Sequence, residues 1–179
     1  MTVTMSPVKR TVLAALCAAL CVVLPITFHA IPNAGSIFLP MHIPVLLCGM
    51  VCGWPYGLIC GLMGPALSSL LTMMPPPAIL PSMMVECAVY GMVSGLMLKF
   101  VRTGKTAWDL YIALVAAMLA GRVVAGVAKA LIFSPDITMS VWIAGSFVTA
   151  LPGILVQLVA IPLLVQLLMK TRQIPERYN

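Results

Sequence analysis

The chain has 179 residues, of which 62% are hydrophobic and 8% are charged, and its formal net charge is +6. Soluble domains carry about 25% charged residues, so this chain has too little polar surface to cover a soluble fold, and soluble enzymes are excluded. No hydrophilic stretch is long enough to fold separately, so we expect residues 1–179 to form a single integral membrane domain.

Six apolar runs are long enough to cross a bilayer, for which a helix needs about 17 to 25 residues. In chain order, the predicted spans lie near 11–28, 39–53, 56–73, 79–99, 108–133 and 141–169. The segment "CGWPYG" at 52–57 is either a tight turn or a proline kink within one long hydrophobic hairpin. The predicted fold is therefore an all-α membrane protein, a bundle of six transmembrane helices.

Basic residues gather before the first span, between the fourth and fifth spans, and after the last. They are Lys9, Arg10, Lys99, Arg102, Lys105, Lys170, Arg172 and Arg177. With six spans these residues all fall on one side, which the positive-inside rule makes cytoplasmic. Both termini are thus predicted to be cytoplasmic, and topology explains the basic charge without nucleic acid.

The first span contains "LAALCAAL", which places two overlapping pairs of small residues four positions apart. The pairs are Ala14 with Ala18 and Ala15 with Ala19. Small residues at this spacing let helix backbones approach closely in lipid. This face is a candidate docking surface, either for another part of the chain or for a partner protein.

Three charged residues lie well inside predicted spans, away from their ends. Arg122 and Lys129 project to one face of their helix, about 16 Å and about 6 Å below its outer end at 1.5 Å per residue. Glu86 lies about 10 Å below the outer end of its own helix by the same rise. Intramembrane charges usually face a bundle interior or a wet cavity and mark a substrate path. Two cations with one anion leave a surplus positive charge that a bound carboxylate could neutralise.

A structural interpretation stays open for the same residues: Glu86 and Arg122 form an interhelical ion pair, and Lys129 snorkels to the outer interface. In the ligand-site interpretation, Lys129 and Glu86 touch the ligand and Arg122 holds Glu86 in place. Both interpretations place Arg122 beside Glu86. The complete set of candidate ligand-binding residues is Glu86, Lys129, Arg122, Asn33, Tyr90, Trp142 and Gln157.

Two of these candidates lie near the predicted outer surface. Asn33 belongs to the proline-containing loop "FHAIPNAGSIFLP" at 28–40, which could serve as a lid. Trp142, at the outer start of the last span, either stacks on a ring of the ligand or anchors the helix at the interface.

No catalytic, metal or nucleotide motif is visible. The six cysteines lack histidine or carboxylate partners at metal-ligand spacing, and His29 and His42 are isolated in the sequence. There is no P-loop and no Ser/His/Asp arrangement. We therefore expect neither enzymatic activity nor a bound metal or cofactor.

The order of several motifs resembles the substrate-binding S components of energy-coupling factor (ECF) transporters. After the alanine pairs come "HIPVLLCGMVCGWPYGLICGLMGPALSSLLTMMPP" at 42–76 and "MMVECAVYGMVSGL" at 83–96. The resemblance implies high-affinity capture of a vitamin or related micronutrient at a bacterial plasma membrane. It also implies a transmembrane coupling subunit and two ATPases as partners, with the alanine face as the contact, and a ligand enclosed by the loop after the first span and the outer parts of the fourth to sixth spans.

Two other functions stay open from the sequence: a self-contained proton-coupled secondary carrier using Glu86, and a non-transporting structural membrane subunit. The surplus cation favours a ligand with a carboxylate or phosphate, and pantothenate is the first candidate. Glu86 could equally accept hydrogen bonds from an amine or a ring N–H.

Overall fold

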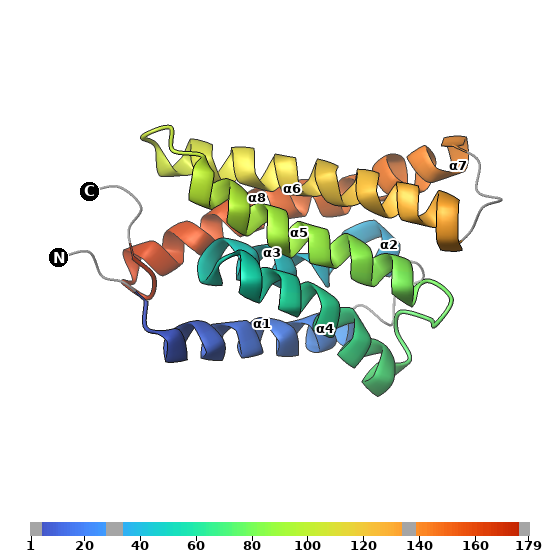
Figure 1. Ribbon diagram of the computed structural model, residues 1–179, viewed down its shortest axis with the longest axis horizontal. Helices are drawn as coiled ribbons and strands as arrows, with labels where there is room; N and C mark the ends of the chain where they lie inside the picture. Colours follow the sequence, from blue (N-terminus) through green and yellow to red (C-terminus); the bar gives the residue numbers. More distant parts are fainter. Residues whose placement is uncertain (1–4, 28–33, 134–138, 176–179) are drawn as a thin grey trace.

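The computed structural model describes residues 5–27, 34–133 and 139–175. These residues form helices and connecting turns, with no strand among them (Figure 1). The elements are α1 (Pro7–Thr27), α2 (Ala34–Phe38), α3 (His42–Cys52), α4 (Trp54–Thr72), α5 (Leu80–Phe100), α6 (Thr106–Ala128), the π-helix η1 (Lys129–Phe133), α7 (Met139–Ile143), the π-helix η2 (Ala144–Thr149) and α8 (Leu151–Lys170).

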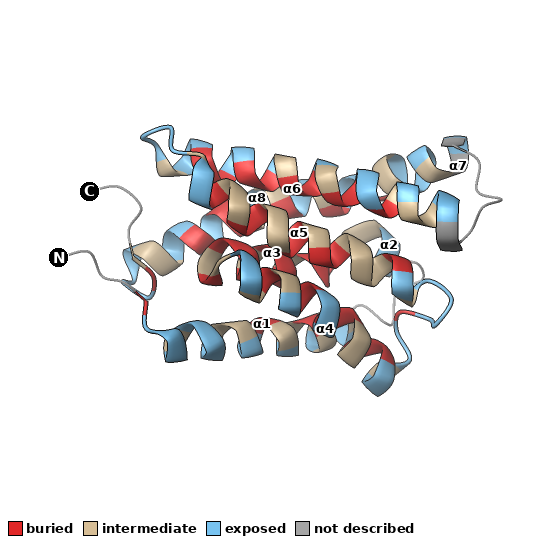
Figure 2. Ribbon diagram, viewed as in Figure 1, coloured by how far each residue is buried: buried red, intermediate tan, exposed pale blue. Residues whose placement is uncertain are grey.

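Within the described residues, six helical segments are long and apolar enough to cross a membrane, which confirms the predicted bundle of six helices. They are Pro7–Thr27, Gly35–Cys52, Trp54–Thr72, Leu80–Phe100, Thr106–Leu131 and Leu151–Lys170. Large apolar side chains point away from the bundle: Val159 is 67% exposed and Leu163 is 64% exposed. Such a surface would be costly in water and is suited to contact with lipid (Figure 2).

The backbone differs from the prediction in two spans. The last one, expected as one helix over 141–169, is divided into α7, η2 and α8. Pro152 lies in the first turn of α8, where its missing N–H costs no helical hydrogen bond, so it favours the start of a new helix at this point. The second span starts earlier than expected, with α2, and is interrupted before α3 where Leu39 has a positive φ of 50°.

A tight turn, rather than a proline kink, joins α3 to α4. Gly53 separates the two helices with φ 99° and ψ 167°, a region that favours glycine because it has no Cβ. Pro55 lies in the first turn of α4, where its missing N–H costs no helical hydrogen bond.

Glycines allow α3, α4 and α5 to pack with their backbones in contact. A Cβ added at Gly57 would lie 2.2 Å from the carbonyl oxygen of Gly91 and 2.6 Å from Cα of Gly49. A Cβ at Gly61 would lie 2.3 Å from the carbonyl oxygen of Cys87. Small residues are the usual means of close helix packing in lipid, where no hydrophobic force draws helices together.

The two ends of the bundle differ in charge. α1 begins, α5 ends, α6 begins and α8 ends at the same end of the molecule, whereas α2 and α7 lie at the other (Figure 1). The first end therefore carries Lys9, Lys99, Lys105 and Lys170. We refer to it below as the basic end.

Candidate functional site

A cavity of about 810 Å³ lies at the end opposite the basic end. Its walls come from the 35–42 segment, the start of α5, the second half of α6 with η1, and the 142–150 segment. Three predicted charges and the predicted tryptophan are brought together there. The polar and aromatic lining residues that concern us are His42, Glu86, Arg122, Lys129, Trp142 and Ser146.

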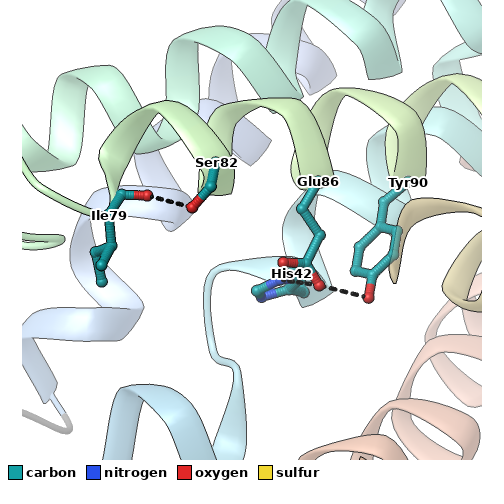
Figure 3. A network of polar contacts seen from close by, with 5 residues as sticks. All are labelled: His42, Ile79, Ser82, Glu86 and Tyr90. Carbon is teal, nitrogen blue, oxygen red and sulfur yellow. Dashed lines mark hydrogen bonds and ion pairs between the residues drawn. The ribbon is translucent and has the colours of Figure 1, made fainter. Parts of the chain in front are cut away.

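Glu86 is held by residues of α5 and α3 (Figure 3). The hydroxyl of Tyr90, one turn further along α5, donates a hydrogen bond of 2.9 Å to Oε1 of Glu86. Nε2 of His42 lies 3.8 Å from the same oxygen. The Tyr90 side chain is completely buried and is absent from the cavity lining. It therefore contacts the carboxylate from the side that faces away from the cavity.

The predicted pairing of Arg122 with Glu86 is wrong. Among the described residues, the ion-pair contact of Glu86 is with His42. Arg122 is 3% exposed, its guanidinium carbon lies 5.3 Å from the centre of the Phe147 ring, and its Nε has no hydrogen-bond partner in the described part of the chain. Depth along a helix does not tell which neighbouring helix a side chain faces. In the structure, the rotation of α6 places the Arg122 guanidinium against Phe147 of η2 and away from Glu86.

Lys129 and Trp142, two of the predicted ligand-binding residues, both line the cavity. Lys129 begins η1, and no ion pair involving it occurs among the described residues. Trp142 packs on α6 where Gly126 leaves room, since a Cβ there would lie 2.5 Å from the indole ring. The Trp142 and Phe147 rings meet edge to face, with centroids 5.9 Å apart.

The remaining candidate residues are placed differently. Gln157 on α8 is completely buried, but it is not part of the cavity lining, and its amide has no hydrogen-bond partner among the described residues. Asn33 lies outside the described residues, so its predicted role stays a prediction.

Sequence reasoning missed His42 and Phe147. His42 has no other ligand-type residue near it in the sequence, yet it lies at the start of α3 directly beside Glu86. The available signal was position, since both residues lie in the outer halves of predicted spans. Phe147 carries no such signal, because an aromatic residue in an apolar span is ordinary.

The four alanines of α1 divide into two sets. Ala15 and Ala19 are exposed, whereas Ala14 and Ala18 are half-buried and pack against the core. An apolar groove of about 500 Å³ runs between α1 and α4. It is lined by Ala15, Ala18, Ala19, Val22, Val23, Leu67 and Leu71.

A family model described as "ECF transporter, substrate-specific component" matches residues 9–165. Comparisons with curated proteins and with solved structures give no match. The family match covers most of the chain, and it decides between substrate capture, a secondary carrier and a structural subunit. ECF substrate-specific components are not enzymes; they bind small molecules and work with a membrane coupling subunit and two ATPases. The chain therefore belongs to the substrate-specific (S) components of ECF transporters, and is a multi-pass membrane protein that captures a substrate for import.

Proposed function

We propose that this S component captures a carboxylate-bearing vitamin or related micronutrient with high affinity, and that pantothenate is the first candidate. The observation that carries the proposal is the charge of the cavity. Arg122 and Lys129 both line it and make no ion pair among the described residues. The one carboxylate among the described lining residues, Glu86, already accepts a hydrogen bond from Tyr90.

No described residue neutralises the charge of Arg122. Its contact with the Phe147 ring is of a kind worth about 0.5–2 kcal/mol, but a ring face accepts few of the five N–H donors of a guanidinium. A buried charge without a counter-ion is strongly unfavourable. A ligand carboxylate could bind the guanidinium with two parallel hydrogen bonds, which makes an anionic substrate the best-matched occupant.

The side from which the substrate enters follows from the basic residues. They gather at the end opposite the cavity, and the positive-inside rule assigns that end to the cytoplasm. Both termini are then cytoplasmic, and the cavity opens on the outer side of a bacterial plasma membrane. This orientation suits capture from outside the cell.

The first test is binding of pantothenate to the purified protein in detergent, without partners. We expect Lys129→Ala to weaken binding by about 1.5–3 kcal/mol, the usual cost of losing a hydrogen bond to a charged group. Calorimetric titration measures the change. Lys170→Ala is the matched control, because Lys170 is exposed at the basic end and should bind as the wild type does.

Biotin and thiamine extend this test. Binding of biotin but not pantothenate would replace the candidate while keeping the carboxylate requirement. Binding of the cation thiamine alone, or normal pantothenate affinity in Lys129→Ala, would contradict the proposed site.

A second prediction distinguishes the observed arrangement from a structural ion pair. Arg122→Ala should weaken pantothenate binding at least as much as Lys129→Ala does. Because Glu86 is held by Tyr90 and lies beside His42, adding Glu86→Gln should not restore stability to Arg122→Ala. Breaking a buried ion pair costs about 3–5 kcal/mol, so recovery of that size in thermal unfolding of the double mutant would show that Arg122 and Glu86 are paired after all.

A further inference from the structure

His42 and Glu86 form a second polar part of the cavity, distinct from the two cations. The imidazole is 1% exposed, it lines the cavity, and neither of its nitrogens has a hydrogen-bond partner among the described residues. Nε2 lies 3.8 Å from Oε1 of Glu86, which is too far for a direct hydrogen bond. A buried imidazole and a half-buried carboxylate thus lie side by side at the cavity wall, and no described residue satisfies the imidazole nitrogens.

Residues of three helices fix this arrangement. Tyr90 donates its hydrogen bond to Glu86, and its ring packs against His42 with centroids 5.1 Å apart and an interplanar angle of 58°. Gly121 on α6 leaves room for that ring, since a Cβ there would lie 2.0 Å from a Tyr90 ring carbon. Figure 3 shows Glu86 and Tyr90 projecting from α5 towards His42 on α3. Tyr90 therefore contacts the pair on the side away from the cavity, while His42 and Glu86 themselves line the cavity.

The chemistry of the pair selects one kind of partner. A neutral imidazole offers one N–H donor and one acceptor, and a carboxylate offers acceptors only. Because Nε2 faces a carboxylate, the tautomer with the proton on Nε2 is favoured, and His42 is then a donor at this point. An amine or a ring N–H could satisfy Glu86, but it would leave this donor unmatched. A hydroxyl group both accepts and donates. Because 3.8 Å is less than the sum of two hydrogen-bond lengths of about 2.8 Å, one oxygen can bond to both residues.

We infer that the His42–Glu86 pair recognises a hydroxyl group of the substrate. This inference rests on the proposed function and narrows its substrate class to hydroxylated carboxylates. The carboxylate binds at Arg122 and Lys129, and the hydroxyl binds at His42 and Glu86. Tyr90 acts as a positioning residue for Glu86.

The test compares two probes that share a carboxylate and differ in hydroxyl groups: pantothenate and N-(3,3-dimethylbutanoyl)-β-alanine, which lacks both hydroxyls. The wild type should bind pantothenate at least about 10-fold more tightly than the analogue. His42→Phe and Glu86→Gln should reduce the ratio of pantothenate affinity to analogue affinity towards one. Lys129→Ala should weaken both probes by the same factor. Glu86→Gln keeps the shape of the side chain, so it serves if His42→Phe does not fold.

Different outcomes overturn the two proposals. Equal affinity of the wild type for both probes, or equal losses for both in His42→Phe and Glu86→Gln, would overturn hydroxyl recognition while leaving carboxylate capture intact. Binding of biotin with no binding of pantothenate would do the same, because biotin has a carboxylate and no hydroxyl. Failure of every carboxylate to bind, with thiamine binding instead, would overturn both.

Discussion

Replacing Ala19 by leucine is expected to abolish substrate uptake while leaving substrate affinity unchanged. Ala19 is exposed on α1 and lines the groove between α1 and α4. We propose that the coupling subunit docks on this face, where small side chains permit close approach of its helices. A leucine at this position adds bulk at the contact, and no alanine of α1 lines the substrate cavity. Uptake by the complete transporter and titration of the isolated protein measure the two properties separately.

The exposure of the alanines decides which substitutions are informative. Ala15→Leu should behave as Ala19→Leu does, whereas leucine at Ala14 or Ala18 would also disturb packing against the core. Ala107→Leu is the matched control, because Ala107 is an exposed alanine on a different helix, α6. Normal uptake with leucine at both exposed positions of α1 would remove this face as the docking site.

The largest loss of stability is expected from Gly57→Ala. The added Cβ would lie 2.2 Å from the Gly91 carbonyl oxygen, and a backbone atom cannot turn aside as a side chain can. Overpacking by one carbon typically costs about 1–3 kcal/mol, and we expect a loss of at least about 3 kcal/mol here because α3, α4 and α5 would all have to move. Thermal unfolding in detergent measures the change.

Two other glycines complete a graded series. At Gly64 the nearest atom to a new Cβ is the Cys21 sulfur at 2.8 Å, a side-chain atom that can shift, so Gly64→Ala should cost less. At Gly145 nothing lies within 4 Å of a new Cβ, and Gly145→Ala should unfold at the same temperature as the wild type. Equal stability of all three variants would show that the backbones are not as close as described.

The six-helix fold could be predicted because lipid imposes a simple requirement on sequence, an apolar run of about 20 residues for each span. The interruptions of the second and sixth spans could not be predicted from the sequence. The residues that flank the break before α3, and those that flank η2, are apolar. Hydropathy indicates that such a segment lies in lipid, but it does not indicate where the helix is interrupted. Pro152 was visible, but a proline in a membrane helix is compatible with either a kink or an end.

The candidate site divides along similar lines. Glu86, Arg122 and Lys129 were found because a charge inside a membrane needs a reason, and counting residues along each helix placed them at compatible depths. Counting does not give the rotation of one helix against another. Counting therefore predicts a pairing of Arg122 with Glu86. In the structure, Arg122 lies against the Phe147 ring and Glu86 lies beside His42.

The close packing of α3, α4 and α5 also bears on how this protein can acquire new substrates. Substitutions at Gly57 or Gly91 meet backbone atoms, so the packing that positions α3 and α5, which carry His42 and Glu86, cannot vary without loss of the fold. In η2, by contrast, every side chain is exposed or half-buried, and substitutions at such positions usually change stability by less than about 0.5 kcal/mol. Mutations that alter specificity while the protein still folds should therefore accumulate in η2, around Ser146 and Phe147, rather than between α3 and α5.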